Sequence, residues 1–498
     1  MNPWRRRAAL FALGLVLLSV SWMLGTAPFG GSDEHDHFAR AAAVVRGDLL
    51  PVEGPHGSGW LRVPPDVARD VSDACSAVRY RPLEVCQVLR SGDDTLVWTG
   101  AAAYHPAYYA WIGWPTLLLD SEGALWAARV LSAVPALVLL TIAFCVTTSV
   151  LGATWVGLSF LLALTPMLLH SLATIQPSAV EICAAAALAS VCLAALAGRS
   201  SHGLWLLAVV SGSALALARA LGPLFVVLIP LLVARADAGA YARIWLKSRG
   251  AWAAALIIGV ATATSVAWTV AARPTELGAS AGQGLGWAKA ALGTVGMLPH
   301  WLVGSFGRLP RSGADLPTVA VAVWLSVCLA LLAASAMRGD RGLRIAALWT
   351  TVMWLVVPAV LVALTAVSSS LVGWQGRYSF PLLLVALMLA GASLTEKHVS
   401  VRSAMAAASL VAVSVALASR QAWGYFGMGL DAANHPTRPY DAVLPIWALV
   451  ALLLAGFAFV ALAALPCQDP PGTAEDPTDS EAAMERAPTQ RAFRSRLI

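Results

Sequence analysis

The chain has 498 residues, of which 58% are hydrophobic and only 12% are charged, and its mean hydropathy is +0.72. A soluble globular protein usually carries about twice that fraction of charged residues, so the composition excludes a soluble domain. The formal net charge of +6 does not indicate a nucleic-acid partner, because the basic residues are scattered over short connections. The sequence therefore predicts an all-α integral membrane protein, in which helices satisfy the backbone within the bilayer.

Twelve apolar stretches are candidates for membrane crossings, since a helix of about 20 residues spans the hydrocarbon core. The first lacks an obvious cleavage site and is expected to be an uncleaved anchor. The fifth and sixth are short, so they form either a tight hairpin or two crossings. The stretches lie near residues 8–27, 123–149, 154–173, 179–198, 203–218, 221–234, 251–271, 317–336, 345–367, 378–394, 402–418 and 442–465.

The distribution of basic residues predicts the topology. Residues 235–250, 337–344 and 396–402 are the basic connections, and the positive-inside rule assigns them to the cytoplasm. With the N-terminus inside, the outer face holds the long first loop, 28–122, and the connections 171–178, 272–316, 368–377 and 420–441. We expect one membrane domain, residues 1–465, in the inner (cytoplasmic) membrane of a bacterium. Residues 466–498 lack an apolar period and are expected to be a disordered cytoplasmic tail.

A row of five ionisable residues, from Asp33 to His37, follows directly on the first apolar stretch. Residues 33–46 have a helical pattern, with one apolar stripe and an opposite face that carries Asp33, Asp36, His37 and Arg40. The pattern predicts a short helix lying along the membrane interface. Its polar face is either a solvated surface or a reaction centre.

Later in the chain, isolated polar residues stand at the outer ends of apolar stretches. His105 lies in a Tyr-His-Pro segment at the end of the first loop, and Arg129 near the start of the second stretch either snorkels or binds an anion. Glu181 could stabilise a helix N-terminus. Arg219 and Arg377 lie near the outer surface, and the planar guanidinium of arginine suits phosphate groups.

Two cysteines, Cys75 and Cys86, stand apart from the others because both lie in the hydrophilic first loop. If that loop is extracytoplasmic, a disulfide between them is plausible. Four of the remaining five fall inside apolar stretches, where cysteine behaves as a small packing residue.

Four motifs occur in an order that resembles a bacterial family of polytopic membrane proteins catalogued as a domain of unknown function, whose usual first-loop motif is P-D-E-P-x-H-x-x-R-A. That family is similar to the GT-C glycosyltransferases, membrane enzymes that use polyprenyl-phosphate-linked sugars. The resemblance covers roughly residues 7–465, and the motifs are P-F-G-G-S-D-E-H-D-H-F-A-R-A, Y-H-P-A-Y-Y, L-T-P-M-L-L-H-S-L-A-T-I-Q-P-S-A and Q-G-R-Y-S-F-P.

The resemblance implies a GT-C-like fold with catalysis on the outer face, where an acidic residue of the first loop acts as general base toward the acceptor. By position, Asp33 and Glu34 match the acidic pair of the family motif, and Asp33 is the first choice for the base. His37 and Arg40 match the histidine and arginine of the motif. Arg219 stands where relatives often carry a lysine. The expected donor is a polyprenyl-phosphate sugar, and the expected acceptor a glycan.

Elementary chemistry agrees with this assignment. A sugar that leaves a lipid phosphate requires a cation near that phosphate and a carboxylate to take the acceptor proton. The candidate substrate-binding residues are His37, Arg40, His105, Arg129, Arg219, Arg377 and Tyr378. A divalent metal bound by Asp33, Glu34 and His37 is a second expectation, ranked lower because consecutive helical residues diverge. A transporter or flippase of a lipid-linked or small solute is the alternative function, and a non-catalytic scaffold the third.

Overall fold

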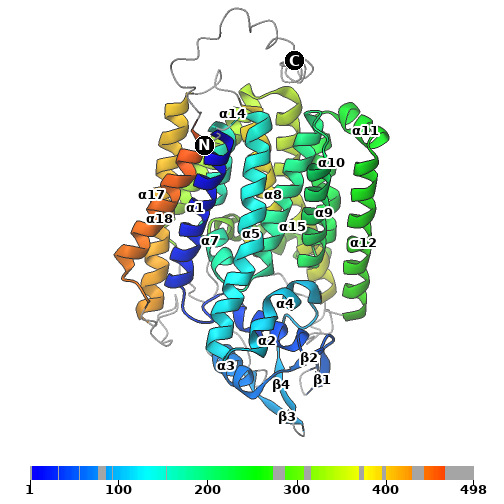
Figure 1. Cartoon of the computed structure of the whole chain (residues 1–498), viewed down its shortest axis with the longest axis vertical. Helices are drawn as coiled ribbons and strands as arrows, with labels where there is room; N and C mark the ends of the chain where they lie inside the picture. Colours follow the sequence, from blue (N-terminus) through cyan, green and yellow to red (C-terminus); the bar gives the residue numbers. More distant parts are fainter. Residues whose placement is uncertain are drawn as a thin grey trace, which may run out of the picture.

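A computed structural model describes most of the chain. The described residues are 3–465, apart from 32, 55–56, 77–85, 92–93, 153, 273–285, 308–315, 370–374, 395–399 and 429–441. The predicted disordered tail, residues 466–498, therefore lies outside the described part. The protein has two layers along its long axis, a helical bundle and a smaller subdomain that packs against one end of it (Figure 1).

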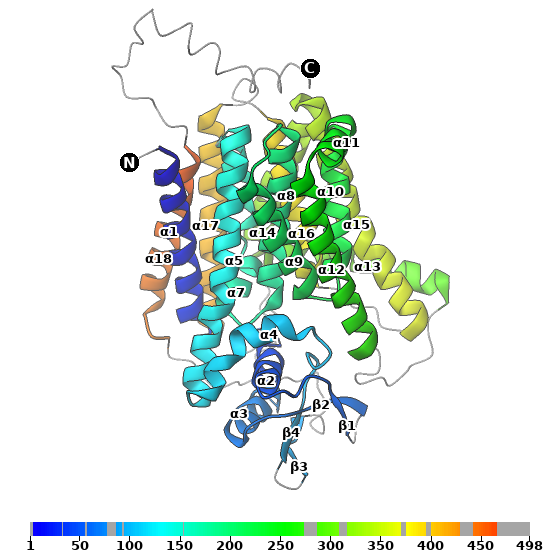
Figure 2. The same cartoon turned by 45° about the vertical axis from the view of Figure 1, so that its right-hand side comes forward.

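The bundle confirms the prediction of a mostly helical membrane protein. It consists of α-helices, most of which run roughly parallel to the long axis (Figures 1 and 2). They are α1 (Pro3–Gly25), α5 (Ser121–Leu151), α6 (Thr154–Ala163), α7 (Pro166–Ala173), α8 (Pro177–Leu196), α9 (His202–Ala218), α10 (Gly222–Ala234), α11 (Ala238–Lys247), α12 (Arg249–Ala272), α13 (Trp287–Gly307), α14 (Thr318–Arg338), α15 (Arg341–Ser369), α16 (Phe380–Ser393), α17 (Val401–Met428) and α18 (Ile446–Ala464).

Twelve full crossings are not confirmed. Among the described residues, eight helices are long and apolar enough to span a membrane, or up to ten if each bent pair counts as one span. The pairs α6–α7 and α10–α11 bend by 69° and 119°, and α9 and α16 are shorter apolar helices. Proline explains the first bend, since Pro166 has no N–H to continue the ladder of α6. The segment 272–316, predicted as an outer connection, contains α13.

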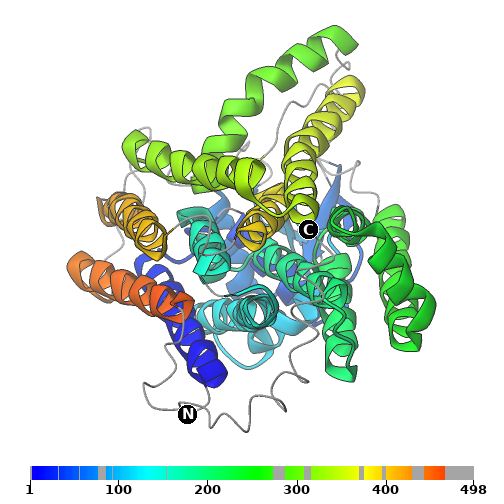
Figure 3. The same cartoon turned by 90° about the horizontal axis from the view of Figure 1, so that it is seen from above.

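The centre of the bundle is formed by α8 and α16, all of whose residues are buried. The two ends of the membrane domain meet at its edge, where α1 packs along α18 (Figure 3). Gly14 permits this approach, because a Cβ there would lie 2.7 Å from the carbonyl oxygen of Gly456. Arg7 Nη2 donates to the carbonyl oxygen of Leu465 at 3.1 Å, so the start of α1 and the end of α18 are neighbours.

The first loop forms a compact subdomain at the opposite end from the start of α1 (Figure 1), and we call it the outer subdomain after the predicted location of this loop. Its four strands pair antiparallel in the order β1-β2-β4-β3, and a disulfide joins Cys75 and Cys86 beside them. These strands were not predicted from the sequence, because strands of three to six residues leave too little alternation to detect. The elements are α2 (Glu34–Val44), β1 (Val52–Gly54), β2 (Gly57–Arg62), α3 (Pro65–Ser76), β3 (Leu89–Ser91), β4 (Asp94–Trp98), α4 (Pro106–Gly113) and the 3-10 turn η2 (Trp114–Leu117).

Candidate active site

Helix α2 joins the two layers, and every one of its residues is buried. The predicted short helix is present, and of the two interpretations of its polar face, the burial excludes a solvated surface. The polar side chains of α2 do not face water, and Glu34, Asp36, His37 and Arg40 contact partners from the bundle or from the outer subdomain. This placement brings the acidic row of the sequence into contact with residues from the far end of the chain.

Asp33 precedes α2 in an unusual conformation. Its φ of 55° lies in the left-handed region, where few residues other than glycine are found. An aspartate at this position usually caps the helix by accepting from a backbone N–H, but the Asp33 side chain makes no such bond. Its Oδ2 instead accepts from Arg377 Nη2 at 3.1 Å. Asp33 is 27% exposed, so it is the accessible carboxylate of the cluster.

Arg377 lies in a short 3-10 turn, η4 (Gly376–Tyr378), that leads into α16. Two glycines bring this turn close to α13, since a Cβ on Gly376 would lie 2.3 Å from the carbonyl carbon of Gly304. The Arg377 side chain is 3% exposed, and its Nη1 donates to Gln176 Oε1 at 3.0 Å. The structure therefore brings together Asp33 and Arg377, which lie 344 positions apart in the sequence.

A second guanidinium, that of Arg219, flanks the same aromatic ring as Arg377. The Cζ atoms of Arg219 and Arg377 lie 4.1 and 5.3 Å from the centre of the Tyr378 ring. Arg219 also contacts Ser178 Oγ at 3.3 Å and Glu181 Oε2 at 3.6 Å. The partnership of Glu181 was not foreseen, although a carboxylate within an apolar helix signals a nearby cation.

The contacts of Glu34 indicate a structural role for its carboxylate. It is fully buried, and its two oxygens accept from Arg129 Nε and Nη2, both at 2.8 Å, and from the backbone N–H groups of Gly31 and Ile175. Burial opposes ionisation, but the charge and hydrogen bonds of Arg129 and the two N–H groups hold the pKa of Glu34 below its ordinary value. These contacts argue against Glu34 as the catalytic base.

Arg129 neither snorkels nor has a guanidinium nitrogen available for an anion. It is 0% exposed, and its remaining contacts are the carbonyl oxygens of Thr26 and Ala27. Arg40 has a similar role, because it is buried and donates to the carbonyls of Asp48, Leu49 and Tyr104. The structure does not place these two arginines as substrate contacts.

The two predicted histidines differ in position. His37 Nδ1 lies 2.8 Å from Tyr109 Oη, and burial lowers the pKa of His37 to about 4, against the raising effect of Asp33 and Asp36. His37 is therefore neutral at pH 7. His105 is the N-cap of α4, where Nδ1 accepts from the N–H of Ala107, and its ring packs against Trp268. His105 therefore positions α4, and its contacts lie away from Asp33.

A metal centre built on Asp33, Glu34 and His37 does not fit the geometry. Both oxygens of Glu34 are committed to Arg129 and to backbone N–H groups. Within the described ranges, no group of three or more His, Cys, Asp or Glu side chains is placed to hold a metal ion. The residues around Asp33 instead combine one accessible carboxylate with two guanidiniums and a tyrosine, which suits an anion and an acceptor hydroxyl.

Tyr104, in the outer subdomain, contacts Arg219 and Arg40. Its hydroxyl accepts from Arg219 Nη2 at 3.4 Å, and its carbonyl accepts from Arg40. Burial raises the pKa of Tyr104, in opposition to Arg219, so the hydroxyl stays protonated at neutral pH. We refer to Asp33, Gln176, Arg219, Arg377 and Tyr378 as the Asp33 cluster.

Solved structures of other proteins are similar to this chain at low sequence identity. Two solved structures of ArnT from Cupriavidus metallidurans are similar over 92% of this chain and 76% of ArnT: one bound to undecaprenyl phosphate (TM-score 0.43, 13% identity) and one in the apo state (TM-score 0.44, 15% identity). The archaeal oligosaccharyltransferase AglB from Archaeoglobus fulgidus, in complex with an inhibitory peptide and a dolichol-phosphate, has a TM-score of 0.41 at 12% identity, over 89% of this chain and 63% of AglB. None of the curated proteins matches the chain.

The family comparison covers far more than half of the chain. The model of the predicted membrane proteins DUF2142 matches residues 15–386, a range that includes α2, the broken helix α6–α7, α8 and the Arg377 turn. It confirms the family that the motifs of the sequence indicated, and the chain belongs to the family of predicted membrane proteins DUF2142.

Proposed function

We propose that the protein is a membrane glycosyltransferase that moves a hexosyl or pentosyl group from a polyprenyl-phosphate donor to a hydroxyl of a cell-envelope glycan or lipid-linked acceptor. The reaction takes place at the Asp33 cluster, on the outer face of the bacterial inner membrane. The single observation that carries the proposal is the pairing of Asp33, the accessible carboxylate, with the guanidinium of Arg377 at 3.1 Å.

The chemistry of transfer requires both groups. The acceptor oxygen forms a bond to the anomeric carbon as the bond from that carbon to the phosphate oxygen breaks, and the electron pair leaves with the lipid phosphate. Arg377 and Arg219 stabilise the charge that develops on this phosphate. Asp33 takes the acceptor proton. A single displacement of this kind inverts the anomeric configuration.

The ion pair between Asp33 and Arg377 links binding of the donor to the basicity of Asp33. A donor phosphate that binds Arg377 competes with Asp33 for Nη2, so binding of the donor weakens the hold of Arg377 on the carboxylate. Asp33 then becomes a better base when the donor is in place. Gln176 Oε1 and the Tyr378 ring keep Arg377 in position while its partner changes. The low exposure of both arginines strengthens their attraction to a phosphate.

The test is transfer by the full-length protein in liposomes, with undecaprenyl-phosphate-linked hexoses and pentoses as donors and extracted envelope glycan as acceptor. Asp33→Asn keeps the size of the side chain and removes its basicity, so we expect a fall in turnover of about 10²-fold or more. Release of undecaprenyl phosphate and of glycosylated acceptor measures it. Asp70→Asn, at a carboxylate on α3 in the outer subdomain that pairs with Arg69, is the matched control and should leave turnover unchanged.

Unchanged transfer by folded Asp33→Asn protein would contradict the proposal. Movement of the intact lipid-linked sugar across sealed vesicles, without cleavage of the sugar–phosphate bond and with the same rate in Asp33→Asn, would instead support a flippase.

A further inference from the structure

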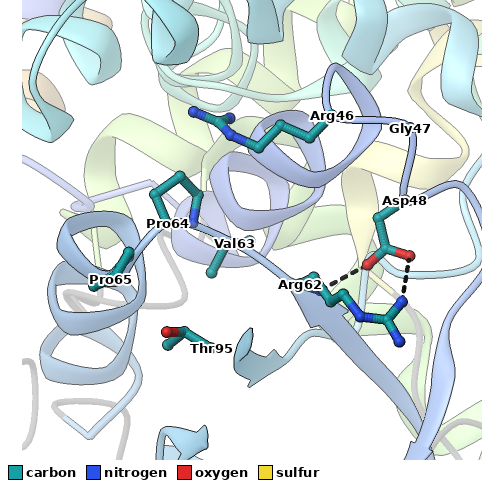
Figure 4. Close-up of a pocket in the computed structure, with 8 residues that line it drawn as sticks. All are labelled: Arg46, Gly47, Asp48, Arg62, Val63, Pro64, Pro65 and Thr95. Atoms are coloured by element: carbon teal, nitrogen blue, oxygen red, sulfur yellow. Dashed lines mark hydrogen bonds and ion pairs between the residues drawn. The ribbon is translucent and has the colours of Figure 1, made fainter. Parts of the chain in front are cut away.

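A second site lies in the outer subdomain, at the far end of α2 from Asp33. A cavity of about 480 Å³ opens there, and Figure 4 shows its lining side chains around a depression between the end of α2, β2 and the start of α3. The lining residues are Arg46, Gly47, Asp48, Arg62, Val63, Pro64, Pro65 and Thr95. None of them belongs to the Asp33 cluster. We call this site the Arg46–Arg62 cavity.

The charges of the Arg46–Arg62 cavity do not cancel. Asp48 pairs with one of the two guanidiniums, since its Oδ1 lies 3.7 Å from Arg62 Nη1. The other guanidinium, of Arg46, donates to the carbonyls of Ala42 and Thr116 and to Thr116 Oγ1, all of which are uncharged. Arg46 makes no ion pair with a carboxylate among the described residues, although Asp66 at the start of α3 acts on its charge from farther away. The lining itself therefore carries two guanidiniums and one carboxylate, which suits an anion.

The walls of the cavity are held in place before any ligand arrives. Arg46 is fixed by three hydrogen bonds, of which the one to the carbonyl of Ala42 caps the end of α2 and the other two reach Thr116. Asp48 Oδ2 accepts from the N–H of Arg62 at 2.6 Å, as the dashed lines of Figure 4 show, so it fixes the end of β2. Gly47 has a φ of 85°, and a Cβ at this position would meet no atom within 4 Å. Binding therefore requires little reorganisation.

The position of the cavity connects it to the reaction centre. Asp33 precedes α2 and Arg46 follows it, so about 20 Å of helix separates them. Midway, Arg40 ties the chain at Asp48 and Leu49 to Tyr104, whose hydroxyl contacts Arg219. One rigid element thus presents a base at one end and a cationic cavity at the other. An extended chain molecule can engage both ends at once.

We infer that the Arg46–Arg62 cavity is an acceptor subsite that binds a sugar residue bearing a carboxylate or a phosphate, some residues away from the hydroxyl that reacts at Asp33. This inference rests on the proposed function, because it assigns the acceptor of that reaction to an acidic glycan. The guanidiniums bind the acidic group, while Thr95 and the Asp48 carboxylate are available to sugar hydroxyls. A neutral glycan offers nothing to balance the charge of Arg46.

The test measures binding to the full-length protein in nanodiscs of neutral phosphatidylcholine by calorimetry. The probes are D-glucuronate, glucose 6-phosphate, glucose and inorganic phosphate. We expect the two acidic sugars to bind, glucose to bind at least about tenfold more weakly, and inorganic phosphate to bind more weakly than glucose 6-phosphate. Arg62→Gln, at an exposed side chain, should weaken the acidic sugars about tenfold. Asp48→Asn should tighten them about two- to fivefold by removing a repulsive charge.

Two controls separate this site from the reaction centre. Arg69→Gln removes an exposed arginine of α3 that does not line the cavity, and Arg377→Gln removes a guanidinium of the Asp33 cluster; both should bind the acidic sugars like the wild type. Binding that survives Arg62→Gln unchanged, equal binding of glucose and glucuronate, or absence of binding overturns the acceptor subsite. Loss of binding with Arg377→Gln would place the probes at the Asp33 cluster instead. Transfer activity is not read in this experiment, so its outcome is independent of the proposed reaction.

Discussion

Asp33 and Glu34 are adjacent carboxylates whose surroundings give them different roles. Glu34 is enclosed by Arg129 and two backbone N–H groups, whereas Asp33 is partly exposed and meets a single guanidinium nitrogen. The left-handed backbone at Asp33 turns its carboxylate away from the helix end and toward Arg377. Strain of this kind is concentrated at functional sites, where the rest of the fold holds the residue in place.

The first prediction separates the two roles by stability. Glu34→Gln leaves Arg129 buried without its counter-charge, so we expect the free energy of unfolding to fall by about 3–5 kcal/mol. Arg129→Met leaves the Glu34 carboxylate buried without its counter-charge, so it should lower the free energy of unfolding by a similar amount. Asp33→Asn lies at a partly exposed pair and should change stability by less than about 1 kcal/mol.

Thermal unfolding in detergent, with the yield of monodisperse protein, measures the difference. The result that would reverse the assignment is Glu34→Gln protein with the melting temperature of the wild type and no transfer activity. Glu34 would then be the base, and the ion pair with Arg129 would be a resting arrangement.

At the residue scale, the sequence was sufficient to choose the candidates but not to pair them. Asp33 was selected from the acidic row, and Arg377 and Arg219 as isolated charges beside apolar stretches; the three come together in the fold. A buried charge requires a partner, so Glu34 and Arg129 each implied one. Which charge pairs with which depends on contacts across 95 positions, and no local pattern encodes them.

At the scale of elements, the position of Arg377 depends on a glycine contact between η4 and α13. A Cβ on Gly376 would lie 2.3 Å from the carbonyl carbon of Gly304 and from the backbone nitrogen of Ser305, both of which are backbone atoms that cannot rotate away. Gly376→Ala must therefore displace the turn that carries Arg377. We expect a loss of stability of about 1–3 kcal/mol and a fall in transfer larger than the loss of folded protein accounts for.

A matched control lies in the same helix. A Cβ at Gly296 of α13 would meet no atom within 4 Å, so Gly296→Ala should leave transfer unchanged and stabilise the helix by up to about 1 kcal/mol. Donor titrations distinguish the effects, because a displaced Arg377 raises KM for the lipid-linked sugar. Equal behaviour of the two variants would show that the glycine contact does not position Arg377.

Elements with long apolar patterns were predictable, and short or mixed ones were not. The helices α1, α5, α8, α12, α14, α15, α17 and α18 lie where apolar stretches of sufficient length predicted crossings. The strands of the outer subdomain are too short for a period of two, and α13 contains a lysine, a histidine and an internal proline that hide its apolar character. The burial of α2 could not be read from its amphipathic pattern, because both of its faces are covered by other elements.

At the scale of the whole molecule, the two layers place the first-loop subdomain and the start of α1 at opposite ends of the bundle. The start of α1 and the basic helix α11 lie at one end, and the outer subdomain lies at the other (Figures 1 and 2). The bond from Arg7 to Leu465 places the end of α18 at the first of these ends. The basic connections favour the cytoplasm for that end. The disulfide between Cys75 and Cys86 favours an oxidising compartment for the other.

This arrangement yields a prediction about labelling from either side of the membrane. The described free cysteines are buried, so after replacement of Cys467 by serine the chain offers a background for single exposed thiols. Glu53→Cys lies in β1 of the outer subdomain, and Arg341→Cys lies at the start of α15, beside the end of α16. A membrane-impermeant maleimide should label Glu53→Cys in intact spheroplasts and Arg341→Cys only after permeabilisation.

The two possible failures of this experiment have different meanings. Reversed labelling would show that the protein has the opposite orientation in the membrane. The Asp33 cluster would then face the cytoplasm, and the donor would have to be on that side. Labelling of both thiols from the same side would instead contradict the separation of the two layers, because the bundle between β1 and the start of α15 is the only part of the described chain with helices long enough to cross the bilayer. The outward orientation matters for the chemistry, since an acceptor that belongs to the cell envelope reaches the cluster only from outside.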